Sequence, residues 1–161
     1  MSVKQEKAEI NCKEKLHKKT LICIADVANK GKTKTAENVI NILRNIIGST
    51  IVYNNKTNIS FIFRIGNQNI GVDTKGDPKT NFPKRVDYLA SNPTYPCDAI
   101  VCTSRSFGET LDAAKTTANN YSMLFLKTST YQHDDLPSVE TLFNDYKAEH
   151  IIDLLKKRRH I

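Results

Sequence analysis

The sequence lacks any apolar run long enough to cross a bilayer, and residues 1–20 contain no hydrophobic segment of the kind found in secretory signals. Tryptophan is absent and aromatic residues make up only 7% of the chain. In particular, no aromatic residue interrupts the basic ends, where one would stack on the bases of a nucleic acid. These absences favour a cytoplasmic protein that does not bind membranes.

Cysteine is also scarce. The four cysteines form no C-x-x-C pair, and no histidine lies beside them at the spacing of a zinc site. Cys23 and Cys102 fall within apolar runs, so we expect both to be small, buried, reduced core residues. The pattern therefore excludes a disulfide framework and argues against zinc.

The composition is that of one globular domain, with 161 residues, 39% hydrophobic and 25% charged residues, and a net charge of +7. We predict a flexible basic arm over residues 1–19 and a single domain over residues 20–161. Basic ends also attract polyanions, so nucleic-acid binding stays open as a weakly supported alternative. The basic residues at the two ends are Lys4, Lys7, Lys13, Lys15, Lys18 and Lys19, then Lys156, Lys157, Arg158 and Arg159.

Hydrophobic periodicity predicts strands alternating with helices, hence an α/β fold with a mainly parallel sheet and helices on both faces. A short turn at residues 66–68 predicts an antiparallel hairpin between two of the strands. Ala36, Val39, Ile40, Leu43 and Ile47 are expected on one apolar face of the first helix. The predicted strands span residues 20–25, 50–53, 59–65, 69–73, 98–103 and 121–126, and the predicted helices 36–47, 83–90, 108–119 and 138–159.

The most informative segment is Gly31-Lys32-Thr33, which lies between the apolar run 21–25 and the first amphipathic helix. Strand, tight loop, Gly-Lys-Thr and helix is the order that cradles nucleotide phosphates. Loop N–H groups and the helix dipole attract anions, and Gly31 allows close backbone approach. We therefore expect Lys32 to bind the β- and γ-phosphates and Thr33 to ligate Mg²⁺. The predicted nucleotide-binding residues are Asn29, Lys30, Gly31, Lys32, Thr33 and Lys34, together with Gly76.

The full phosphate-loop pattern is G-x-x-x-x-G-K-[ST], and here Asp26 stands in place of its first glycine. Asp tolerates turn conformations, but it brings a negative charge near the phosphates. We expect its side chain to point away from them. The simpler alternative for the whole segment is a polar turn that caps a helix.

Polar residues that follow the other buried strands form the second part of the predicted site, because ligands bind at the carboxyl ends of parallel strands. Asp73 is the first choice as a Mg²⁺ partner of Thr33 and Asp77 the second, the alternative being a simple turn with Gly76. Arg105 is expected to neutralise a transferring phosphoryl group, or else to be an ordinary surface arginine.

Two further residues, Gly108 and His133, follow strands of the predicted sheet. Gly108 opens a helix whose N-terminus is a second candidate anion site. His133 follows the last predicted strand without a visible partner, so we treat it as a loop residue.

Together these segments resemble the P-loop NTPase superfamily over residues 20–126. Asp73-Thr74-Lys75-Gly76 is similar to the D-x-x-G switch of Ras-like GTPases. The resemblance implies a three-layer fold, with Lys32 as phosphate ligand, Asp73 holding the metal through water and Gly76 sensing the γ-phosphate. Those GTPases carry N-K-x-D after a late strand, whereas this chain has Lys127-Thr128-Ser129-Thr130, so ATP is expected rather than GTP.

Three functions follow as alternatives. The first is Mg²⁺-dependent ATP hydrolysis or small-molecule phosphoryl transfer, in which Lys32, Asp73 and Arg105 carry the catalytic roles. The second is a nucleotide-gated module in which residues 73–82 order around the γ-phosphate and control a protein partner. The third is a degenerate P-loop domain whose basic ends serve nucleic acid.

Overall fold

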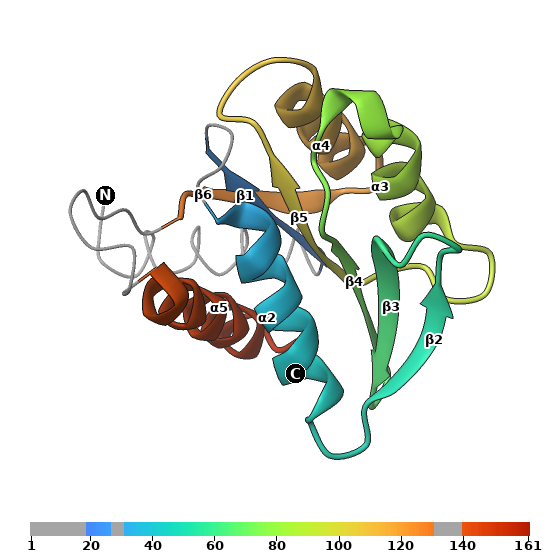
Figure 1. Cartoon of the computed structure of the whole chain (residues 1–161). Coiled ribbons are helices and arrows are strands. Elements are labelled where there is room, and N and C mark those ends of the chain that lie inside the picture. The colour runs from blue at the N-terminus through green and yellow to red at the C-terminus, as the bar shows by residue number, and fades with distance from the viewer. Residues whose placement is uncertain (1–18, 27–30, 131–139) are drawn as a thin grey trace, which may run out of the picture.

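The computed structural model describes residues 19–26, 31–130 and 140–161. Its strands and helices alternate along most of the chain (Figure 1). The strands are β1 (Lys19–Ala25), β2 (Thr50–Asn54), β3 (Ser60–Ile65), β4 (Gln68–Asp73), β5 (Ala99–Ser104) and β6 (Met123–Thr128). The helices are α2 (Lys32–Arg44), the 3₁₀ turn η1 (Pro78–Thr80), α3 (Phe82–Ser91), α4 (Glu109–Asn120) and α5 (Glu140–Lys157).

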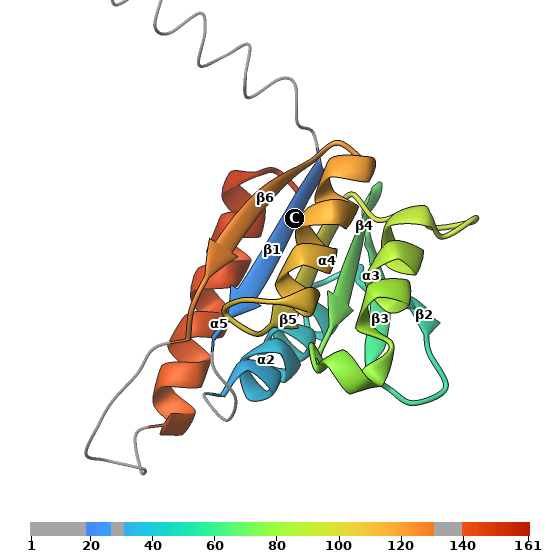
Figure 2. The same cartoon turned by 90° about the horizontal axis from the view of Figure 1, so that it is seen from above.

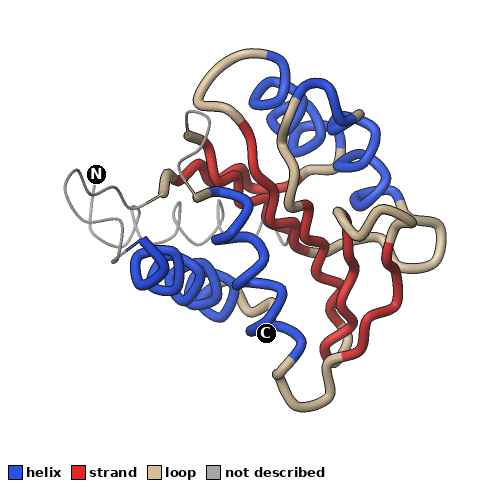
Figure 3. Tube along the Cα trace, in the orientation of Figure 1, coloured by secondary structure: helices blue, strands red, loops and turns tan. Residues whose placement is uncertain are grey.

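The six described strands form one sheet in the order β2-β3-β4-β5-β1-β6. The strands β4, β5, β1 and β6 are parallel neighbours, whereas β3 pairs antiparallel with both β2 and β4. The trace in Figure 3 shows these strands running side by side through the centre of the molecule. Because β1, β4, β5 and β6 are parallel, their carboxyl ends share one edge of the sheet, and the predicted site residues follow those ends.

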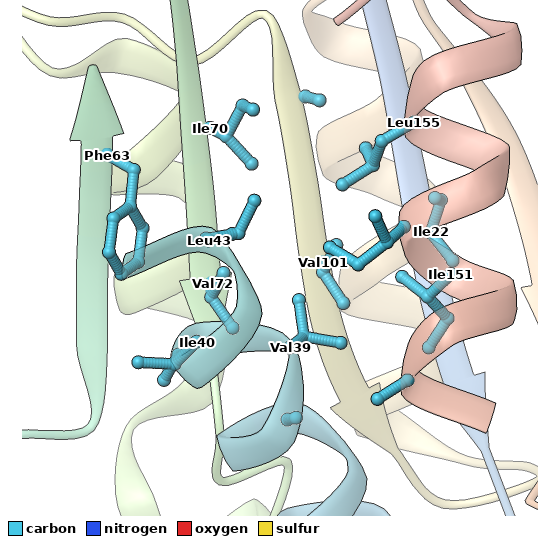
Figure 4. Close-up of a cluster of buried hydrophobic side chains, with 14 of the residues drawn as sticks. Ile22, Val39, Ile40, Leu43, Phe63, Ile70, Val72, Val101, Ile151 and Leu155 are labelled. Carbon is cyan, nitrogen blue, oxygen red and sulfur yellow. The ribbon is translucent and has the colours of Figure 1, made fainter. Parts of the chain in front are cut away.

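Helices cover both faces of the sheet, α2 with α5 on one and α3 with α4 on the other (Figures 1 and 2). The alternation of side chains along β1 explains the two layers. Ile22 and Ile24 pack under α2 and α5, whereas Leu21 and Cys23 pack under α3 and α4. Figure 4 shows the first of these cores, in which α2 and α5 bury apolar side chains against β1, β3, β4 and β5.

The predicted α/β class, the predominance of parallel pairing, the antiparallel hairpin and the helices on both faces are confirmed. Cys23 and Cys102 are fully buried, as expected, and face each other across the β1–β5 pair. β1 begins at Lys19, within the segment assigned to the basic arm. Residues 1–18 lie outside the described part of the chain.

The largest boundary errors concern the first helix and the last strand. The helix α2 begins at Lys32 and not at residue 36, so it includes Lys32 and Thr33 of the Gly-Lys-Thr segment. The helix α2 ends at Arg44, so Ile47 lies beyond it and is 99% exposed instead of joining its apolar face. The last strand covers 123–128 and not 121–126, because Tyr121 and Ser122 complete the turn after α4. In the described segments, no helix combines the length and apolar character that crossing a bilayer requires.

Candidate functional site

The junction between β1 and α2 contains the predicted phosphate loop. The described chain stops at Asp26 and resumes at Gly31, so Asn29 and Lys30 lie outside the described residues. Gly31 has a φ of 78°, in the left-handed region that favours glycine. A Cβ at this position would lie 2.5 Å from Oδ1 of Asn144, a residue of α5. The positive φ therefore favours glycine immediately before the helix, and a larger residue would also have to displace the side chain of Asn144.

Lys32 is the first residue of α2 and turns back toward the end of β1. Its Nζ donates a hydrogen bond of 2.7 Å to the backbone oxygen of Asp26. Partial burial lowers the pKa of Lys32, and the positive charge of Arg105 lowers it further, whereas the Asp26 carboxylate opposes this shift. The ammonium group thus lies at the sheet edge, close enough to Arg105 for the two cations to repel each other.

The first turn of α2 has the wrong charge for an isolated helix. It contains Lys32 and Lys34 and no acidic residue, and its N-cap residue, Gly31, has no side chain that could cap the N–H groups. Positive charge at a helix N-terminus is unfavourable, because that end of the dipole is itself positive. A bound anion would remove this unfavourable interaction. Thr33, the predicted Mg²⁺ ligand, is exposed in the same turn.

The N-terminus of α4 provides an internal comparison. Its first turn holds Glu109 and Asp112, which offset the helix dipole, and the hydroxyl of Thr110 accepts a hydrogen bond of 3.2 Å from the Arg105 backbone N–H. The helix that follows Gly108 therefore carries its own negative charge. The structure favours α2 over α4 as the anion site.

Asp26 is buried beside the loop, and its side chain is directed toward the segment after β6. Its Oδ2 accepts a hydrogen bond of 2.7 Å from the hydroxyl of Thr130. The hydroxyl of Thr130 therefore orients the carboxylate toward the segment after β6, and the expectation that it points away from bound phosphates stays a prediction. The sequence analysis did not identify Thr130, and the only available signal was its place after a strand next to β1.

Asp73 is fully buried at the end of β4, and an ion pair occupies its carboxylate. Arg85 donates from Nε to Oδ2 at 2.7 Å and from Nη2 to Oδ1 at 3.1 Å, and the Ser60 hydroxyl donates to Oδ2 at 2.6 Å. Since β5 separates β4 from β1, the two strands lie about 10 Å apart, at roughly 4.8 Å per neighbouring pair. The predicted metal role for Asp73 stays a prediction, and the contacts present are those of a structural ion pair.

Arg85, on α3, is the principal residue that the sequence analysis missed. Besides Asp73, its guanidinium donates to the backbone oxygens of Lys75 and Thr80. It therefore fixes the whole segment between β4 and α3. Its only sequence signal is a place on a short amphipathic helix, which does not distinguish it from the exposed Lys84 beside it.

The remaining residues of this segment build a turn. The backbone N–H of Gly76 donates to the Thr103 hydroxyl at 2.8 Å, and a Cβ on Gly76 would lie 1.7 Å from the Thr103 backbone oxygen. Asp77 caps η1 by accepting from the Lys79 backbone N–H at 3.1 Å. Asp77 thus has the role of a turn residue, which was the alternative to a metal ligand. Gly76, which is predicted to sense a γ-phosphate, donates its backbone N–H to β5 in this structure.

The structure places Lys32 and Arg105 after the carboxyl ends of the neighbouring strands β1 and β5, within electrostatic reach of each other. Asp73 lies two strands from β1, and Gly76 contacts β5, the strand next to β1. His133 lies outside the described residues. Within the described ranges, no three His, Cys, Asp or Glu side chains gather as a metal site would require.

Comparisons with models of protein families, with curated proteins and with solved structures find no match to this chain.

Proposed function

We propose that this protein binds the polyphosphate of a nucleoside triphosphate, ATP in the first instance, at the N-terminus of α2. The observation that carries the proposal is the first turn of α2, where Gly31 adopts a left-handed conformation and Lys32 and Lys34 stand in place of the usual acidic residues. A polyanion would convert this local repulsion into attraction.

Each residue near the loop has a definite place in this proposal. Lys32, now bonded to a backbone oxygen, would turn its ammonium group to the β- and γ-phosphates. Arg105, exposed at the end of β5 and within electrostatic reach of Lys32, would neutralise charge on the γ-phosphoryl group. The charge of Asp26 acts on Lys32 more strongly than that of Arg105 does, and an anion placed between the two cations would be attracted to both.

Mg²⁺ would bind through the exposed hydroxyl of Thr33 and the phosphate oxygens, and when bound it neutralises charge on the transferred phosphoryl group. Asp73 contributes by holding the segment after β4 through Arg85. The proposed reaction class is ATP hydrolysis or phosphoryl transfer to a small molecule.

One observation favours a second candidate, the nucleotide-gated module. The segment 75–80 is held by two donors, the backbone N–H of Gly76, which bonds to Thr103, and the guanidinium of Arg85. A γ-phosphate would compete for both donors. Such competition would rearrange the segment and alter a surface for a protein partner. In that case turnover would be slow and partner binding would depend on the nucleotide.

Thermal unfolding with and without Mg²⁺ and nucleotide tests the binding proposal. Ligand at about 100 times its dissociation constant stabilises the folded state by roughly 2.7 kcal/mol, which raises the melting temperature of a chain this size by roughly 5–11 °C. Lys32→Ala should fold and lose this response, whereas Lys115→Ala, a change of an exposed lysine on α4, should keep it. An equal ATP response in Lys32→Ala would overturn the proposal, and phosphate release distinguishes hydrolysis from gating.

A further inference from the structure

A second concave site lies next to the proposed phosphate site and is not used by it. It is a pocket of about 240 Å³ between α2 and the start of β3, on the face of the sheet that α2 covers. Its lining combines amides, a hydroxyl, one ion pair and two apolar side chains. The lining residues are Lys34, Glu37, Ile40, Asn41, Asn58, Phe61 and Thr74.

The pocket extends from the phosphate site along α2. Lys34 belongs to the first turn of the helix, and Thr74 directly follows Asp73 at the end of β4. Asn41 is seven residues after Lys34, hence about 10 Å farther along the helix axis on the same face. A ligand of nucleoside size would fill this length with one end beside the N-terminus of α2.

The polar groups of the pocket offer both hydrogen-bond donors and acceptors to a ligand. Asn58 has a φ of 53°, and its Oδ1 accepts a hydrogen bond of 2.7 Å from Nδ2 of Asn54, which leaves its amide N–H groups as donors. The hydroxyl of Thr74 donates to the backbone oxygen of Ile59 at 3.2 Å, so its oxygen remains an acceptor. Asn41 has no hydrogen-bond partner among the described residues and offers both a donor and an acceptor.

The other lining groups select a neutral ligand with a flat apolar surface. Ile40 and Phe61 are almost fully buried and present apolar walls, Ile40 lying on the side of α2 that faces β3 and β4 (Figure 4). Lys34 and Glu37 approach to 3.9 Å, so their charges compensate and a phosphate placed between them would meet the carboxylate. Asn58 lies near Thr74, at the same end as Lys34, so the amide of Asn41 at the other end is the group that suits the hydrogen-bonding edge of a base.

We propose that this pocket binds a nucleoside, with its base beside Asn41 and its sugar toward Lys34 and Asn58. The proposal rests on the proposed function, because a sugar hydroxyl would then lie beside the γ-phosphate of ATP and accept it. In that transfer the hydroxyl oxygen bonds to the γ-phosphorus, the bond to the β–γ bridging oxygen breaks, ADP leaves, and the hydroxyl proton passes to water.

Equilibrium binding of adenosine, guanosine, cytidine and uridine to the full chain tests this assignment, with and without a non-hydrolysable ATP analogue. Asn58→Gly removes the amide and keeps a residue that accepts positive φ, and Asn41→Leu removes the other amide at an exposed helix position. Each change should weaken the best nucleoside about tenfold. Asn45→Ala, after the end of α2, should leave it unchanged.

The outcomes separate this inference from the proposed function. Both pocket variants should keep the thermal response to ATP, whereas Lys32→Ala should lose that response and still bind the nucleoside. The inference is overturned if no nucleoside binds more tightly than about 1 mM, if the variants bind as the wild type does, or if a nucleoside monophosphate binds more tightly than the nucleoside. If the wild-type protein does not bind ATP, the proposed function is overturned instead.

Discussion

Replacing Arg85 with methionine removes the guanidinium group that holds Asp73, while the stem of the side chain still packs near the Phe82 ring. Asp73 is fully buried and the Arg85 side chain is only 12% exposed. Removing one partner of a buried ion pair costs about 3–5 kcal/mol, because the other charge is left unpaired. We therefore expect the melting temperature to fall by roughly 6–20 °C, at about 2–4 °C per kcal/mol for a chain of this length.

Chemical and thermal unfolding of Arg85→Met and its control variants measures this loss of stability. Lys84→Ala, an exposed neighbour on α3, should change the free energy of unfolding by no more than about 0.5 kcal/mol. Asp73→Asn combined with Arg85→Met removes both charges and should be less destabilised than Arg85→Met alone. The reasoning is refuted if Arg85→Met behaves like the Lys84 control. If Asp73→Asn leaves stability unchanged but raises the Mg²⁺ concentration that ATP binding requires, Asp73 is a metal ligand.

Three further predictions follow from the structure. Gly76→Ala should destabilise the fold by about 1–3 kcal/mol or more, measured by urea unfolding, because its Cβ would overlap the Thr103 backbone oxygen. Bound polyphosphate should raise the lowered pKa of Lys32, so calorimetry in two buffers should show proton uptake at alkaline pH. The affinity for polyphosphate should fall as the pH rises above the pKa that Lys32 has in the free protein. Absence of proton uptake would contradict the placement of Lys32 beside the phosphates. Burial and the Arg158 charge lower the pKa of His160 below 6.5, so stability should fall as pH drops through 6.5, more in the wild type than in His160→Gln.

The sequence pattern was enough to predict the α/β class, the hairpin and the helices on both faces, because these depend on local hydrophobic periodicity and turn residues. The alternation Leu21, Ile22, Cys23, Ile24 fills both layers, and turn residues mark the hairpin between β3 and β4. The order of the strands was not predictable in the same way. That β5 lies between β1 and β4 depends on packing across the whole sheet, and it sets the distance between Asp73 and the loop.

The candidate site was predictable where backbone chemistry dictates residue type. A glycine before a lysine at a helix start is a local requirement, and Gly31 has the left-handed conformation that this requires. Partners joined by tertiary contact left no such signal. Arg85 reaches Asp73 from twelve residues away, Thr130 reaches Asp26 from 104 residues away in the sequence, and Asn144 packs on Gly31 from the last helix.

The central claim is that the first turn of α2 holds a polyphosphate, and phosphorus NMR of ATP tests it directly. With Mg²⁺ present, adding the wild-type protein should shift or broaden the β- and γ-phosphorus resonances, and Lys32→Ala should leave them as they are in free ATP. Resonances unaffected by the wild-type protein, or affected equally by Lys32→Ala, would contradict the account.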